Sequence, residues 1–165
     1  MTAPRPVTVL VLSLAIVLSP VAAGAQARSR SSSDSADQKE LFDYTLSIEK
    51  IQKLGSVLKV FNEMSAQHPE LQSGDSGGSI SATTAKIQQY PEAVAVLTRN
   101  GLTAREYIVG SMTLIQAGMA VGFKRAGTYK EYPAEMLKIV SRPNLTFVEQ
   151  HYDEITKIVP ALAQQ

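Results

Sequence analysis

The sequence feature that most constrains the fold is the segment from Tyr107 to Phe123, which contains no charged residue. Just before it, Thr103 and Glu106 form a capping box, in which two residues three apart cap a helix start through each other's backbone amides. At about 1.5 Å per residue, a helix over the uncharged segment is roughly 25 Å long and apolar on nearly every side. Exposure of so many apolar side chains to water is unfavourable, so the segment predicts a helix from Thr103 to Ala126 that other structure encloses.

A lipid bilayer and the rest of the chain are the two candidate surroundings of this helix. A membrane span needs about 20 predominantly apolar residues, and the uncharged segment is shorter and contains polar side chains and glycines. Gly118 and Gly122 match the small-residue spacing of paired membrane helices, but the same spacing lets any two helices approach closely. We therefore expect the helix to be the buried centre of a single all-α domain, a helical bundle of about four principal helices.

Gly110, Gly118 and Gly122 lie at multiples of four residues and form a stripe without side chains along this helix. A glycine inside a helix costs about 1 kcal/mol relative to alanine, so the stripe needs a structural reason. Close packing of a neighbouring helix is the favoured reason, because protein interiors are close-packed. Room for a small apolar ligand is the alternative, and it would make the protein a carrier that holds its ligand in the bundle.

The first residues are typical of a signal peptide rather than of a folded domain. Arg5 is the only charged residue among residues 1–27, and Ala25 and Ala27 place small residues where a signal peptidase recognises them. We expect cleavage after Ala27, which makes Arg28 the first mature residue; cleavage after Ala25 is the alternative. An uncleaved anchor is disfavoured because the apolar run is shorter than a bilayer span, so no stable membrane span is expected after processing.

The charge and the cysteine content of the chain restrict its possible partners and the forces that stabilise its fold. The whole sequence has 16 basic and 15 acidic residues, and removal of Arg5 with the signal peptide leaves 15 of each. Such a balanced surface argues against binding to nucleic acid and to anionic lipid. The sequence contains no cysteine, so the fold depends on packing even in an oxidising compartment. The expected location is the bacterial periplasm or the secreted fraction.

The mature chain predicts a short flexible segment followed by one helical domain. Residues 28–37 are polar and of low complexity, which is typical of a flexible N-terminus, and residues 38–165 carry the helical patterns. Apolar spacings of three and four favour one long helix over residues 38–67, although Ser47 could cap a helix that follows an extended lead-in. Asn144 is expected to cap the last helix, which also accounts for its place in an Asn-Leu-Thr glycosylation pattern. Shorter helices are expected over residues 81–89, 91–99 and 133–140.

No group of residues in the sequence predicts catalysis or a bound cofactor. Gly74 to Gly78 resembles the nucleophile motif of chymotrypsin-like serine proteases, but a short helical chain does not provide the scaffold of that triad. His151 lies one turn from Glu154, yet a di-iron bundle needs a second such pair. A b-type haem between Met64 and His151 is permitted by an up-down helix arrangement, but no motif indicates it. We therefore expect no catalytic residue, no metal and no cofactor.

Three parts of the chain resemble small exported helical proteins of bacteria that have no assigned activity. These parts are FDYTLSIEK (residues 42–50), GLTAREYIVG (residues 101–110) and the segment from Asn144 to Ile155. The resemblance implies the fold and export and brings no catalytic residues. The expected function is that of a non-enzymatic envelope protein that binds another protein through an exposed helix face. A carrier of a small apolar ligand is the alternative, and an enzyme would require a polar cleft with converging titratable groups.

Overall fold

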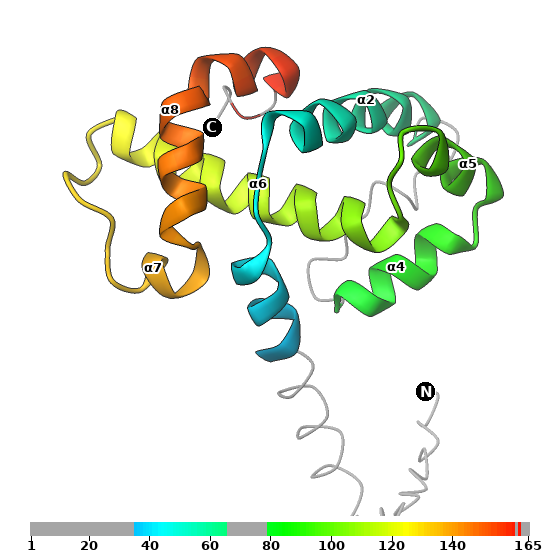
Figure 1. Ribbon diagram of the computed structural model, residues 1–165, viewed down its shortest axis with the longest axis horizontal. Helices are drawn as coiled ribbons and strands as arrows, with labels where there is room; N and C mark the ends of the chain where they lie inside the picture. Colours follow the sequence, from blue (N-terminus) through cyan, green and yellow to red (C-terminus); the bar gives the residue numbers. More distant parts are fainter. Residues whose placement is uncertain (1–34, 66–78, 161, 163–165) are drawn as a thin grey trace, which may run out of the picture.

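The computed structural model describes residues 35–65, 79–160 and 162, and within these residues the chain is all-α with no strand (Figure 1). The predicted all-α class is therefore confirmed. None of the described helices is both long enough and apolar enough to cross a membrane. A helix over residues 35–43 comes first and is followed by α2 (Ile48–Ser65), α4 (Ile80–Gln88), α5 (Pro91–Arg99), α6 (Ala104–Arg125), α7 (Met136–Ile139) and α8 (Arg142–Ile158).

The long helix α6 runs through the centre of the fold and packs against α2, α4, α5 and α8 (Figure 1). Thr103 Oγ1 accepts a hydrogen bond from the Glu106 amide at 3.1 Å, and the Glu106 carboxylate accepts one from the Thr103 amide at 2.9 Å. At the other end Ala126 caps the helix, and Gly127 has a positive φ of 78° that turns the chain away. The predicted ends of this helix are therefore confirmed.

The first part of the described chain contradicts the prediction of one long helix over residues 38–67. The helix over residues 35–43 ends at an extended segment, and α2 begins only at Ile48. The physical reason is Asn144, whose Nδ2 donates to the Tyr44 carbonyl at 2.7 Å and whose Oδ1 accepts from the Leu46 amide at 3.0 Å. These long-range bonds satisfy backbone groups that a continuous helix would otherwise pair within itself.

The structure supports the alternative start of α2 at Ser47 and includes residues 35–37 in the first helix. Ser47 Oγ accepts a hydrogen bond from the Lys50 amide at 3.3 Å, as a helix cap does. Residues 35–37, which were expected to belong to the flexible segment 28–37, are helical. Asp37 explains this difference, because its carboxylate accepts a hydrogen bond from the Ile80 amide at 2.8 Å and so ties the first helix to the start of α4.

The last helix begins earlier than predicted, and Asn144 does not cap it. α8 starts at Arg142 after the N-cap Ser141, with Pro143 in its first turn. Asn144 therefore lies inside the helix and is only 1% exposed, because its side chain makes the long-range bonds described above. A buried side-chain amide is not accessible to glycosylation. The helix expected over residues 133–140 is also shorter, since only α7 forms there.

The hydrophobic core lies between α6 and the helices that surround it. The first helix is fixed on α6 by buried Thr113, whose hydroxyl donates to the Leu41 carbonyl at 3.2 Å. Burial of each large apolar side chain contributes roughly 1.5–3 kcal/mol. The most deeply buried of these side chains come from α2, α5, α6 and α8: Ile51, Leu54, Val57, Leu97, Val109, Leu114, Val121, Leu145, Val148 and Ile155.

Candidate functional site

One side of α6 is exposed to solvent. Met112, Ile115, Met119 and Phe123 are 39%, 45%, 40% and 43% exposed. They recur at spacings of three and four and therefore lie on one face of the helix. The expectation that other structure encloses the whole helix is wrong for this face, which we call the apolar stripe.

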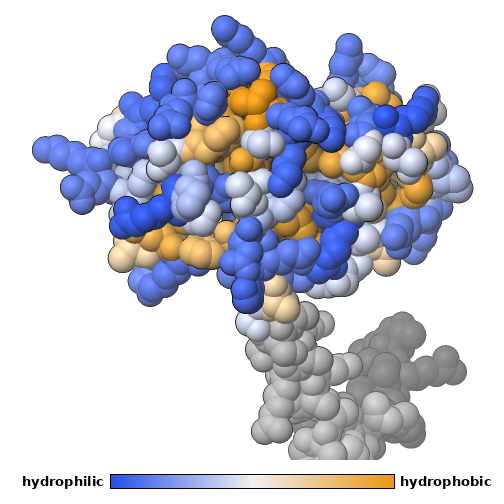
Figure 2. All heavy atoms as spheres, in the orientation of Figure 1, coloured by the Kyte–Doolittle hydropathy of each residue, from blue (hydrophilic) through white to orange (hydrophobic). Residues whose placement is uncertain are grey.

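The apolar stripe is a continuous surface. At 1.5 Å per residue it extends about 16 Å along α6. With about 200 Å² for a whole side chain of this size, its four side chains together expose on the order of 300 Å². Separate hydrophobic patches among hydrophilic side chains, such as those on the face in Figure 2, are a normal surface feature. A continuous apolar patch of the size of the stripe is often a functional contact site.

The stripe is exposed because a short helix covers only the first part of this side of α6. Ala104 and Ile108 lie on the same side as the stripe, and they are only 8% and 6% exposed. α4 packs against α6, and Arg105 donates to Ser81 Oγ of α4 at 3.2 Å. Because α4 has 9 residues and α6 has 22, α4 cannot extend along the whole face.

The predicted glycine stripe lies against other side chains. A Cβ atom at Gly110 would lie 2.9 Å from Tyr44 Oη and 3.2 Å from Leu54 Cδ1, which is closer than ordinary contact. A Cβ atom at Gly118 would lie 2.9 Å from Leu162 Cδ2. Side chains from other parts of the chain therefore occupy the space next to both glycines.

Gly122 is the least crowded of the three predicted glycines. A Cβ atom there would lie 3.6 Å from Tyr152 Oη, which is ordinary van der Waals contact. The three glycines thus face side chains of the same molecule at close or ordinary distance. This arrangement favours close packing, rather than room for a ligand, as the reason for the glycine stripe.

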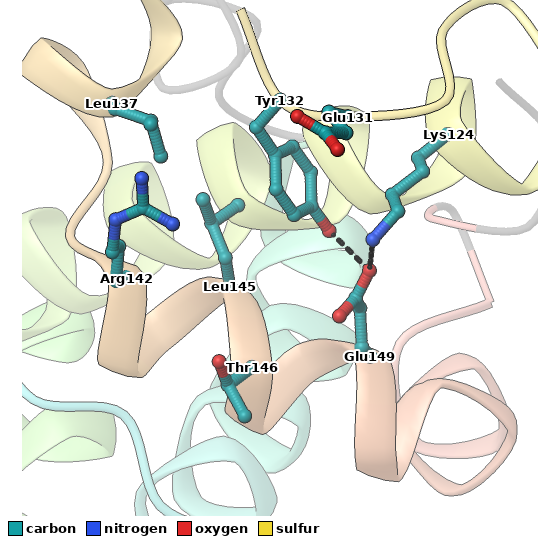
Figure 3. A pocket seen from close by; sticks show the side chains of 8 residues that line it. All are labelled: Lys124, Glu131, Tyr132, Leu137, Arg142, Leu145, Thr146 and Glu149. Carbon is teal, nitrogen blue, oxygen red and sulfur yellow. Dashed lines mark hydrogen bonds and ion pairs between the residues drawn. The ribbon is translucent and has the colours of Figure 1, made fainter. Parts of the chain in front are cut away.

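A pocket of about 280 Å³ lies between the end of α6, the connection that follows it and the start of α8 (Figure 3). Lys124, Tyr132 and Glu149 form a fixed wall of this pocket. The Lys124 ammonium and the Tyr132 hydroxyl both donate to Glu149 Oε1, at 2.6 and 2.7 Å. The ammonium also lies 4.6 Å from the centre of the Tyr132 ring. This network joins the connection to both helices.

The hydrogen bonds of the fixed wall determine its charges. The hydrogen bond from Lys124 lowers the pKa of Glu149, so this carboxylate is ionised at neutral pH. Burial, together with the hydrogen bond to the Glu149 carboxylate, raises the pKa of Tyr132, so the phenol keeps its proton. The ion pair and the hydrogen bond to Glu149 therefore hold the three side chains of the wall together.

The two residues considered for metal or haem binding lie in different surroundings. His151 Nδ1 lies 3.3 Å from Glu154 Oε2, and the imidazole packs against the Phe147 ring with centroids 4.8 Å apart. The backbone of His151 departs from helical geometry, with φ −111° and ψ 15°, so α8 is kinked there. Met64 is partly buried against the core from α2. In the part of the chain that the structure describes, no three His, Asp or Glu side chains form a group that could hold a metal.

Several predicted sites lie outside the described residues. They are the signal-peptide positions Ala25, Ala27 and Arg28 and the motif from Gly74 to Gly78. No protein-family model, no curated protein and no solved structure matches this chain.

The pocket is the feature that the sequence analysis missed. Its signal in the sequence is the recurrence of Arg142, Thr146 and Glu149 at spacings of four and three, which places three polar residues on one face of α8. The opposite side of the pocket comes from the connection after α6, and no helical pattern predicts where that connection packs.

Proposed function

We propose that this protein is an exported, non-enzymatic envelope protein that binds another protein through the apolar stripe of α6. The proposal rests on the exposure of the four stripe residues. Of the six large apolar side chains that are exposed in the described part of the chain, these four lie on one face of α6, and Phe42 and Ile139 lie elsewhere. In this proposal the mature domain is a bundle of about four principal helices around α6, with one side of α6 left for the partner. Export follows from the signal-peptide pattern of residues 1–27.

The partner that fits the stripe is a helix with an apolar face of its own. The stripe carries no charge, and its side chains have the spacing with which one helix packs against another. Two of its four side chains are methionines, which adapt their shape to the surface that they contact. A stable interface needs about 800 Å² from each protein. The stripe offers less than this, so a long-lived complex requires the partner to contact the surrounding surface as well.

The alternative function, a carrier of a small apolar ligand beside the glycine stripe, has less support. Such a ligand needs an apolar cavity. The side chains of Tyr44, Leu54 and Leu162 occupy the space beside Gly110 and Gly118. The observed packing therefore favours the protein-binding function.

Site-specific cross-linking in the native envelope tests the proposal. A photoreactive phenylalanine analogue at Ile115 should give a discrete product with one partner protein, whereas the same analogue at Gln52, an exposed position of α2, should not. Met119→Lys in the same chain should abolish the Ile115 product, because it places a charge in an apolar contact. The proposal is wrong if Ile115 gives no product, if both positions give the same product, or if the product persists in the Met119→Lys chain.

A further inference from the structure

The pocket between α6 and α8 contains two charged side chains that its fixed wall does not use. Arg142 at the start of α8 and Glu131 in the connection line opposite sides of the pocket (Figure 3). Neither side chain forms an ion pair or a hydrogen bond with another of the described residues. By contrast, Lys124 and Glu149 of the same pocket neutralise each other at 2.6 Å. The Arg142 guanidinium and the Glu131 carboxylate are therefore available to a ligand that binds in the pocket.

The surfaces between these two charges combine apolar and polar groups. Leu145, which is only 1% exposed, lies between the two sides of the pocket, and Leu137 lines it near Arg142. The Tyr132 ring lies beside Glu131, and its hydroxyl is held by the hydrogen bond to Glu149. A ligand therefore meets a wall that is already ordered, which reduces the entropic cost of binding.

The charges of the pocket select one class of ligand. Its lining includes two cations, Lys124 and Arg142, and two anions, Glu131 and Glu149, so the lining is neutral and does not favour a simple anion or cation. A zwitterion matches the two available charges, because a guanidinium binds a carboxylate through paired hydrogen bonds and a carboxylate binds an ammonium group.

The size and the apolar surfaces of the pocket narrow this class further. The pocket volume of about 280 Å³ lies just below the usual range of ligand pockets, roughly 300–1,000 Å³, so the pocket suits a small ligand of amino-acid size. We propose that the pocket binds a free amino acid with an apolar side chain. In this complex the ligand carboxylate pairs with Arg142, the ligand ammonium pairs with Glu131, and the ligand side chain contacts Leu137 and the Tyr132 ring.

NMR titration of the ¹⁵N-labelled mature chain with each standard L-amino acid in turn tests this site. At least one apolar amino acid should cause saturable shifts of the amides of Glu131, Arg142 and Thr146. The amide of that amino acid lacks the carboxylate, and its deaminated acid lacks the ammonium group. Each analogue should bind about tenfold more weakly or worse, because each loses one charged hydrogen-bonding partner. The absence of any saturable shift, or equal binding of either analogue, would overturn the proposal.

Two variants assign each charge of the ligand to its residue. Arg142→Gln should weaken binding of the amino acid about tenfold or more and leave binding of its amide unchanged. Glu131→Gln should weaken binding of the amino acid and leave binding of the deaminated acid unchanged. Lys130→Gln, which removes an exposed charge next to the pocket lining, is the matched control and should bind as the wild type does. Wild-type affinity in Arg142→Gln or Glu131→Gln would disprove the assignment, and equal melting temperatures would show that each variant is folded.

Discussion

Removal of the Asn144 side-chain amide is expected to destabilise this protein more than any exposed substitution. The amide is buried in α8 and bridges the Tyr44 carbonyl and the Leu46 amide, at 2.7 and 3.0 Å. Asn144→Ala removes both bonds and leaves a buried backbone donor and a partly buried acceptor without partners. Each unpaired group costs about 1–3 kcal/mol, so for the two groups we expect a loss of about 2–6 kcal/mol of unfolding free energy. That loss is a large fraction of the 5–15 kcal/mol that is typical of small domains.

Urea denaturation followed by circular dichroism measures this loss directly. Thr146→Ala is the matched control, since Thr146 is an exposed residue of the same helix, and it should change the free energy by less than about 0.5 kcal/mol. Hydrogen exchange gives a local test, because the Leu46 amide should exchange faster in Asn144→Ala. A free-energy loss no larger than that of the control, with unchanged exchange at Leu46, would refute the role assigned to Asn144.

Three further predictions concern α6 and the pocket. Gly118→Leu should lower the free energy of unfolding by about 1–3 kcal/mol, because even a Cβ atom there would meet Leu162 at 2.9 Å. Gly122→Ala is its control and should stabilise the helix by up to about 1 kcal/mol; equal effects in urea denaturation would contradict the packing interpretation. Met119→Lys should reduce the binding of a hydrophobic fluorescent dye and change the unfolding free energy by less than about 1 kcal/mol; unchanged dye binding would show that the stripe is not an accessible patch. The pKa of Glu149 in the folded state lies below the ordinary value of 4.5, so its ion pair stabilises the fold above that pH and is lost as the pH falls through the folded pKa. Glu149→Gln should therefore lower the melting temperature at neutral pH and have a progressively smaller effect below pH 4.5; a difference that does not depend on pH would contradict this linkage.

The ends of α6 could be predicted from the sequence because the groups that form them are local. Thr103 and Glu106 are three residues apart, and Gly127 directly follows the cap residue Ala126. The end of the first helix could not be predicted in the same way. Its local pattern favours a continuous helix, and the group that interrupts it is Asn144, in the last helix.

The exposure of the apolar stripe depends on the lengths of other elements. Periodicity shows that α6 is apolar on nearly every side, but it does not show that α4 covers only the part near Ala104 and Ile108. The pocket could not be predicted from the sequence for a similar reason. Glu131 and Arg142 belong to different elements, and only tertiary packing places them on opposite sides of one space.

The two hydrogen bonds of Asn144 join positions that are 98 and 100 residues apart. Closing so long a loop has an entropic cost that must be met before these bonds can form, and contacts of this range slow folding. The extended segment that contains Tyr44 and Leu46 therefore gains these two bonds only when α8 is in place, whereas the helix before it is also held by contacts with α4 and α6. A chain that ends before α8 lacks more than its last helix, because the segment after its first described helix also loses the side chain that pairs with its backbone.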